Sequence, residues 1–181
     1  MIKNKKISQE TIAQTHHLRN EGIPYDASLI EGININRSAV ERRAATIGTR
    51  RSVKKEYQAA WLLKAISCMD LTTLAGDDTR GNVVRLCAKA ANPVRKDLLE
   101  AMGMADAGIT TGAVCVYHNL IPYAVEALKG TNIPIAAVST GFPAGQISLP
   151  EKLKEIELSV AAGAKEIDIV ISRALVLQSD W

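Results

Sequence analysis

From about residue 67 onward, the chain alternates continuously apolar segments with segments of helical period. The apolar segments predict parallel β-strands, because strands buried on both faces are apolar throughout rather than at every second residue. Each is followed by a segment whose apolar positions recur every three or four residues, as on one face of a helix. The predicted strands are Ser67–Leu71, Ile109–Tyr117, Ile133–Ser139 and Glu166–Ile171, and the predicted helices between them cover 77–91, 119–129 and 148–162.

The predicted helix before the last strand has the clearest boundaries. Ser148 and Glu151 have the spacing of a capping box, and Pro150 fits the first turn. Gly163 supplies the stop at the carboxyl end. The apolar residues of this helix have a 4-3-4 spacing, which predicts a single apolar stripe made of Leu149, Leu153, Ile156 and Val160.

Strands separated by single helices predict an α/β fold with a parallel sheet covered on both faces, either a (β/α)₈ barrel or a doubly wound sheet. The sequence holds neither a GxGxxG motif nor a P-loop, which weakens the dinucleotide and nucleotide options. Residues 67–181 have room for about four strand–helix units of roughly 30 residues each. A full barrel needs eight units and about 250 residues, so we expect an incomplete barrel.

The first 60 residues differ from the rest and predict a helical arm, with the barrel half occupying 61–181. A helix-like stretch over Gln9–Glu21 is followed by a turn at Gly22-Ile23-Pro24. A basic helical stretch then covers Arg37–Trp61. Its charges favour a solvated helix face at one end of the domain, with a nucleic-acid contact as the alternative.

The bulk composition is that of an ordinary globular protein, with 47% hydrophobic residues, 23% charged residues and a net charge of +3. That charge is too small to indicate a nucleic-acid partner, and no apolar run approaches the roughly 20 residues that span a bilayer. The basic amino terminus lacks the apolar block of a secretory signal. Three scattered cysteines without CxxC spacing predict reduced thiols rather than disulfides or a zinc site. We therefore expect a cytoplasmic protein without metal, cofactor, nucleic-acid or membrane partner.

Two aspartates, Asp70 and Asp168, interrupt predicted buried strands. Burying an unpaired carboxylate is costly, and such groups collect at active sites. In a barrel both would point into the interior, where paired carboxylates suit proton transfer; the alternative is a structural hydrogen bond. Thr72 and Thr73 follow the first strand as rim residues or a helix cap. Cys115, in mid-strand, is more typical of a small buried core residue than of a chemical role. His118, just after that strand, is equally well explained as a surface loop residue.

Four ordered motifs carry a resemblance to the deoxyribose-phosphate aldolases. Met69–Leu74, with Asp77-Asp78-Thr79, resembles that family's first strand and loop, and Ala113–Tyr117 its second strand. Gly141–Gly145 is similar to its loop after the third strand, and Gly163–Ile171 to its fourth strand. The stretch Arg50–Lys64 resembles the amino-terminal extension of animal-type members, so the resemblance covers about residue 37 to the end.

The resemblance implies a metal-free class I aldolase on a (β/α)₈ barrel, acting in deoxyribonucleotide and carbohydrate catabolism. Such a lyase cleaves the phosphosugar 2-deoxy-D-ribose 5-phosphate to glyceraldehyde 3-phosphate and acetaldehyde through a Schiff base on a lysine. By resemblance, Asp168 matches the catalytic proton-relay aspartate. Asp70, Thr72 and Cys115 match positions of the substrate pocket.

The family's Schiff-base lysine lies in a Thr-Ser-Thr-Gly-Lys motif on the sixth strand, and the sequence lacks this motif. Lys165 precedes the fourth strand, at the end opposite to barrel chemistry. Lys152 and Lys154 are predicted on the polar side of the preceding helix, and the lysines that fall before the first strand, in helices or at helix exits are Lys64, Lys89, Lys96 and Lys129.

We therefore expect the amino-terminal half of such an aldolase, without turnover on its own and without the phosphate site, which barrels build from late loops. Its open strand edges predict a homo-oligomer, aggregation or pairing with the missing barrel half. The alternative is a non-catalytic half-barrel module that pairs with a full-length aldolase or another partner. A basic-arm nucleic-acid binder is a third hypothesis.

Overall fold

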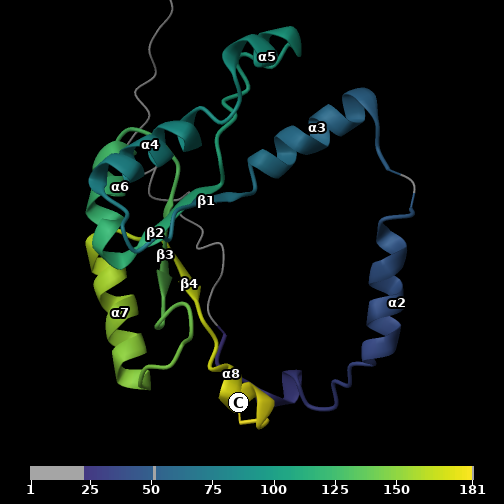
Figure 1. Cartoon of the computed structure of the whole chain (residues 1–181), viewed down its shortest axis with the longest axis vertical. Coiled ribbons are helices and arrows are strands. Elements are labelled where there is room, and N and C mark those ends of the chain that lie inside the picture. Colours follow the sequence, from purple (N-terminus) through teal and green to yellow (C-terminus); the bar gives the residue numbers. More distant parts are fainter. Residues whose placement is uncertain (1–22, 51, 181) are drawn as a thin grey trace, which may run out of the picture. The chain divides into compact units, whose positions relative to one another are not determined.

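The structure is a computed structural model that describes residues 23–50 and 52–180 (Figure 1). Its contacts divide the chain into two units, Met1–Thr49 and Arg50–Trp181. In the first unit, a short 3₁₀ helix η1 (Ala27–Leu29) precedes the helix α2 (Arg37–Ile47). The helix predicted over Gln9–Glu21 lies outside the described residues, and the arm boundary at residue 60 stays a prediction.

The sequence predicts one basic helical stretch over Arg37–Trp61, but the structure divides it between two helices. In the second unit a separate helix, α3, begins at Lys55 and ends at Ile66. Gly48 directly follows α2 as its carboxyl-terminal cap. Glycine is a poor helix former, which accounts for the interruption there.

Four parallel strands form the sheet of the second unit, in the order β1-β2-β3-β4. They are shorter than predicted: β1 covers Asp70–Thr72, β2 Ala113–Tyr117, β3 Ile135–Ser139 and β4 Glu166–Ile169. Each strand therefore pairs with the next one along the chain, and the order does not reverse. This sequential order is that of a barrel wall, whereas a doubly wound sheet has a switch point.

Within the described residues of the second unit, the helices that pack on this sheet lie on one face. The helices α4 (Arg80–Ala91), α6 (Ile121–Ala127) and α7 (Leu149–Ala162) lie on the same side of the strands (Figure 1). The main core lies there, with Val83 of α4 packed against Val114 and Val116 of β2. The sequence predicts a sheet covered on both faces, and in the described part of the second unit helices supply the cover of one of them. The opposite side, which we call the open face, carries a small cluster made only of strand and adjacent residues, with Ala113, Cys115, Ala136 and Val138 at its centre.

Three short helices complete the unit. The 3₁₀ helix η2 (His118–Leu120) leads directly into α6, and α8 (Arg173–Leu177) follows β4. The helix α5 (Lys96–Ala101) was not predicted. It spans only six residues, too few for a clear helical period.

The helix α7 confirms its predicted boundaries but not its predicted stripe. The capping box of Ser148 and Glu151 is present, and Gly163 ends the helix in the left-handed region at φ 113°. The buried positions, however, are Lys152 and Ser159, while the stripe residues Leu149, Leu153 and Val160 are each more than half exposed. The apolar stripe therefore lies to one side of the surface that packs on the sheet.

Within the described residues, the structure contains no helix with the length and apolar character that crossing a membrane requires.

Candidate functional site

The open face brings together the four site residues predicted from the sequence. Thr72 of β1 pairs in register with Cys115 of β2, and Asp70 precedes Thr72 by two residues on the same face. At the other edge of the sheet, Asp168 of β4 pairs with Val138 of β3, whose side chain belongs to the open-face cluster. Cys115 is thus flanked by one aspartate from each edge strand.

The electrostatics of Cys115 confirm this closeness. Burial, and after it the negative charges of Asp168 and Asp70, raise the pKa of the Cys115 thiol from 9.0 to about 11. A backbone hydrogen bond with Val138 and a side-chain hydrogen bond with Thr72 act in the opposite direction. The thiol is therefore protonated near neutral pH. It acts as a small, neutral side chain between two carboxylates.

The two aspartates are not buried, which corrects the expectation that singled them out. Asp70, Thr72 and Asp168 are exposed, and Ile169 beside Asp168 is 58% exposed. The reason is that β1 and β4 are each paired on one side only within the described chain, and no helix of that part covers the open face. Asp70 and Asp168 therefore do not carry the free-energy cost of burying a carboxylate in the described part of the molecule.

Asp78 rigidifies the loop after β1. Its Oδ2 accepts hydrogen bonds from the Thr73 hydroxyl at 2.8 Å and from the Ala75 N–H at 2.9 Å, and its Oδ1 accepts one from Asn82 at 3.1 Å. These hydrogen bonds lower the pKa of Asp78, and the bond from Asn82 has the largest effect, followed by that from Thr73. Thr73, predicted as a rim residue or a helix cap, therefore serves the loop that leads into α4.

Thr140 joins the carboxyl ends of β3 and β4, a role that the sequence did not indicate. Its hydroxyl oxygen accepts a hydrogen bond from the Val170 N–H at 2.6 Å and lies 3.1 Å from the Val170 carbonyl oxygen, to which it can donate. The backbone of Thr140 is left-handed, with φ 61°, which is rare for a β-branched residue. The next residue, Gly141, donates its N–H to Glu155 of α7 at 3.0 Å. These bonds hold the segment that follows Asp168.

His118 lies on the helix side of the sheet. Its Nδ1 lies 3.1 Å from the hydroxyl of Ser159 in α7, with which it forms a hydrogen bond. It also lines a hollow of about 410 Å³ together with Asp78, Tyr117 and Glu155. Across the part of the chain that the structure describes, no group of three or more His, Cys, Asp or Glu side chains is arranged to hold a metal.

Lysine positions bear on the imine chemistry. None of the four strands contains a lysine, and Lys165 directly precedes β4, where its N–H donates to Ile135 at 2.8 Å. The sequence predicts Lys152 on the polar side of α7. The structure instead buries this residue, which is only 7% exposed. Its amine donates to the Ser172 hydroxyl at 2.6 Å, in the segment that follows β4, so this amine is already engaged.

Curated proteins that are similar to this chain are deoxyribose-phosphate aldolases. The human deoxyribose-phosphate aldolase is 57% identical over 164 residues, which is 90% of this chain and 52% of the relative. The Mus musculus deoxyribose-phosphate aldolase is 58% identical over 162 residues, which is 88% of this chain and 51% of the relative. The chain thus spans about half the length of the curated relatives it matches. No protein-family model matches the chain.

Solved structures share the fold. A structure assigned to the deoxyribose-phosphate aldolases from Coccidioides immitis superposes with a TM-score of 0.53 and 21% identity, over 80% of this chain and 51% of that one. An apo structure assigned to the same family from Toxoplasma gondii gives 0.50 and 18%, over 68% and 44%. At these identities the likeness supports the partial (β/α)₈ barrel, and the curated relatives carry the assignment. The chain belongs to the deoxyribose-phosphate aldolase family, and the share of its relatives that it spans agrees with the expected amino-terminal half.

Proposed function

We propose that this chain supplies one side of an aldolase site that cleaves 2-deoxy-D-ribose 5-phosphate to glyceraldehyde 3-phosphate and acetaldehyde. The observation that carries the proposal is the grouping of Asp70, Thr72, Cys115 and Asp168 on the open face. The names of the relatives supply the substrate and the reaction class. The scattered free cysteines support a reducing, cytoplasmic setting.

In this proposal Asp168 relays a proton, and Asp70, Thr72 and Cys115 line the sugar pocket. An exposed carboxylate on an edge strand can exchange protons with a bound water and with a group brought across the open face. The protonated Cys115 adds bulk and no charge, which leaves Asp168 and Asp70 as the nearby acceptors. The Thr72 hydroxyl, which donates to the Asp70 carbonyl at 3.1 Å, retains lone pairs for a sugar hydroxyl.

The Schiff-base lysine comes, in this proposal, from residues outside the four strands. Imine formation needs an amine at the carboxyl ends of the strands, and the lysine amines of this chain that the structure describes are engaged or placed elsewhere. Lys152 is bonded to Ser172, and Lys154 to Glu157 at 2.8 Å. A polypeptide with the remaining strands would bring the amine against Asp168. The chain alone then has no turnover.

Borohydride trapping tests this proposal. The purified chain is incubated with deoxyribose 5-phosphate, alone and with a polypeptide that carries the other half of the human relative, and adducts are located by intact mass. We expect no adduct on the chain alone and one adduct on the added polypeptide. A stable adduct on a lysine of this chain would show that the lysine argument is wrong.

Two matched variants of β4 separate the role of Asp168 from general surface charge. In the reconstituted pair, Asp168→Asn is expected to lower turnover about 100-fold or more, the usual effect of losing a general acid–base group. Glu166→Gln removes a carboxylate from the same strand and face, two residues away, and should leave turnover within about threefold. Equal losses in both variants would overturn the assignment of Asp168.

The second candidate function is a non-catalytic half-barrel that pairs with a full-length aldolase or another partner. The unpaired outer edges of β1 and β4 in the described chain favour it, since such edges accept further strands. It predicts a defined heteromer with the full-length relative and no imine under either trapping condition. Binding that weakens steeply with salt would instead favour the nucleic-acid hypothesis.

A further inference from the structure

The carboxylate of Asp168 lies close to the end of an edge strand. Within the described residues, β4 pairs with β3 alone, and the register of the two strands ends at Ser139 and Ile169, one residue after Asp168. Ile169 is 58% exposed, so side-chain packing holds this end of β4 only weakly. Strand ends with few buried contacts open more readily than the centre of a sheet. The position of Asp168 therefore depends on what holds the chain just after the ladder.

Thr140 supplies a bond at that place. Its hydroxyl oxygen accepts the Val170 N–H at 2.6 Å, and the hydroxyl lies within donating distance of two carbonyl oxygens, that of Ser139 at 2.8 Å and that of Val170 at 3.1 Å. We call the bonds to Val170 the Thr140 tether. Thr140 is only 5% exposed, and its neighbour Gly141 donates its N–H to Glu155 of α7 at 3.0 Å. One end of the tether is thus fixed in the buried part of the fold, and the other holds the chain directly after β4.

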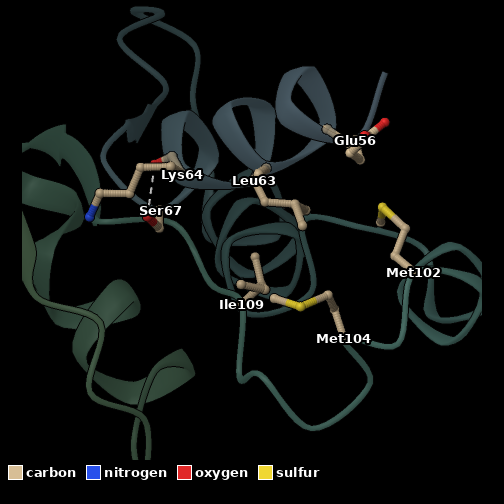
Figure 2. Close-up of a pocket in the computed structure, with 9 residues that line it drawn as sticks. Glu56, Leu63, Lys64, Ser67, Met102, Met104 and Ile109 are labelled. Carbon is tan, nitrogen blue, oxygen red and sulfur yellow. Dashed lines mark hydrogen bonds between the residues drawn. The ribbon is translucent and has the colours of Figure 1, made fainter. Parts of the chain in front are cut away.

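Asp70, the carboxylate on the opposite edge strand, is supported on the side where its strand begins. The turn that ends α3 directly precedes β1, and the Ser67 hydroxyl closes it by donating to the Lys64 carbonyl oxygen at 2.8 Å. Figure 2 shows this bond at the edge of an apolar hollow between α3 and the segment after α5. The Met69 carbonyl oxygen, one residue before Asp70, accepts the Gly112 N–H at 2.9 Å. The backbone itself therefore supports Asp70, whereas the support after β4 comes from a side chain.

We propose that Thr140 is a positioning residue of the aldolase site, which keeps Asp168 in place on the open face through its bonds to Val170. This role rests on the proton-relay function proposed for Asp168. Proton transfer requires the donor and the acceptor within hydrogen-bonding distance, and a displacement of about 1 Å can cost a large part of the rate. Thr140 itself touches no reacting atom. A serine, which keeps the hydroxyl, should therefore replace it, whereas an alanine should not.

A purely structural role is the alternative, because losing the bond also destabilises the fold. The Cys115 thiol distinguishes the two roles, since it lies on the open face, where burial and then the negative charge of Asp168 raise its pKa. At a fixed pH of about 9, the alkylation rate of Cys115 follows its thiolate fraction and so reports whether the carboxylate stays close. Cys87, buried in α4 on the helix side of the sheet, reports opening of the fold.

The first experiment measures alkylation of the 181-residue chain by iodoacetamide, with mass spectrometry as the readout. Thr140→Ala is expected to speed alkylation of Cys115 about threefold, because the loosened carboxylate disfavours the thiolate less. Thr140→Ser should stay at the wild-type rate. In an Asp168→Asn background, Thr140→Ala should change almost nothing, because the charge that it displaces is then absent. An unchanged rate in Thr140→Ala, the same acceleration in the Asp168→Asn background, or an equal acceleration at Cys87 would overturn the proposal.

The second experiment measures turnover of the chain paired with a polypeptide that carries the other half of the human relative. Thr140→Ala is expected to lower kcat about tenfold with KM within about twofold of wild type, since it affects the reacting geometry rather than substrate binding. Ser172→Ala is the matched control. It removes another hydrogen bond of the segment after β4, the one from Lys152 at 2.6 Å, and should keep kcat within about threefold. Equal losses of kcat in the two variants would contradict a specific role of the Thr140 tether.

The two experiments separate this role from the proposed function. A wild-type pair without turnover, or one indifferent to Asp168→Asn, contradicts the proposed function, and alkylation still shows whether Thr140 holds the carboxylate. A loss of kcat in Asp168→Asn that is absent from Thr140→Ala contradicts the positioning role alone. Circular dichroism checks that each variant folds.

Discussion

The hydroxyl of Thr140 fastens the end of β3 to Val170, the first residue after β4, through hydrogen bonds of 2.6 Å and 3.1 Å. The paired register of these strands stops one residue earlier, at Ser139 and Ile169. The side chain therefore continues the ladder where the backbone of Thr140 turns left-handed. Asp168 lies two residues before Val170, so this bond also limits the movement of the candidate proton relay.

Removing the Thr140 hydroxyl should destabilise the fold. Thr140→Ala leaves the Val170 N–H without its acceptor in a partly buried place, and we expect the free energy of unfolding to fall by about 1–3 kcal/mol. Thr140→Ser keeps the oxygen and is the matched control, expected within about 1 kcal/mol of wild type. Urea denaturation followed by circular dichroism measures both. Equal losses in the two variants would mean that the methyl group, rather than the hydroxyl, matters.

The buried amine of Lys152 should depend on Ser172 for its hydrogen bond. Ser172→Ala removes the acceptor that lies 2.6 Å from the amine and is expected to cost about 1–3 kcal/mol, since it leaves a buried charge with one partner fewer. Lys152→Met keeps most of the volume and removes the charge, so its cost should be smaller, or its effect stabilising.

The same denaturation assay also settles how the two residues are coupled. In the double variant, Ser172→Ala should add almost no further loss of stability to that of Lys152→Met, because the Ser172 hydroxyl then has no lysine amine from which to accept a hydrogen bond. Additive losses would show that the bond carries no coupling energy. Lys154→Met, at an exposed position of the same helix, is the control for the loss of a helix lysine.

The order and type of most elements could be predicted because each depends on local sequence. The capping box at Ser148, the glycine stop at Gly163 and the apolar runs of the strands all act through neighbouring residues. Strand ends were less well predicted. Ser67 and Cys68 belong instead to the turn that closes α3, since their N–H groups donate to Leu63 and Ala65.

Burial could not be predicted from residue type alone. Apolar character shows that Ile169 and Leu153 favour an apolar contact, but their exposures of 58% and 57% depend on what covers them. The bonds Thr140–Val170 and Lys152–Ser172 join residues 30 and 20 positions apart. Such pairs leave no periodic signal in a single sequence. The candidate site was found through its strand positions and its resemblance, whereas its supporting bonds needed the fold.

Gly141 should be intolerant of a side chain, for two separable reasons. Its φ is +76°, and an added Cβ would lie 2.9 Å from Cγ1 of Ile147. We expect Gly141→Ala to lower the free energy of unfolding by about 2–4 kcal/mol, since it combines left-handed strain with overpacking. Gly103→Ala is the matched control, because φ is +68° there and nothing lies within 4 Å of the added atom.

The comparison isolates the contact with Ile147. Gly103→Ala should cost only the backbone term of about 1–2 kcal/mol, and thermal denaturation can measure the difference between the two variants. Ile147→Ala in the Gly141→Ala background makes room for the Cβ and should recover part of the difference. If the two glycine variants are equally destabilised, the space around Gly141 is not limiting.

The raised pKa of Cys115 should make stability depend on pH in the alkaline range. Because the folded pKa, about 11, lies above the ordinary 9.0, the folded chain holds this proton more tightly than the unfolded chain. The resulting stabilisation is complete below about pH 9 and is lost as the pH rises through about 11, to a total of at most about 2–3 kcal/mol. Cys115→Ala removes this dependence, whereas the pKa of Cys87, also raised by burial, contributes equally in both proteins.

Asp168 can be tested through the same thiol. Its negative charge disfavours the thiolate, so Asp168→Asn should lower the pKa of Cys115 and speed its alkylation by iodoacetamide at a fixed pH near 9. Mass spectrometry follows Cys115 beside the exposed Cys68, which should react faster and at the same rate in both proteins. Glu166→Gln should leave the rate at Cys115 nearly unchanged. A rate that does not respond to Asp168→Asn would mean that the carboxylate lies too far from the thiol to share a substrate pocket with it.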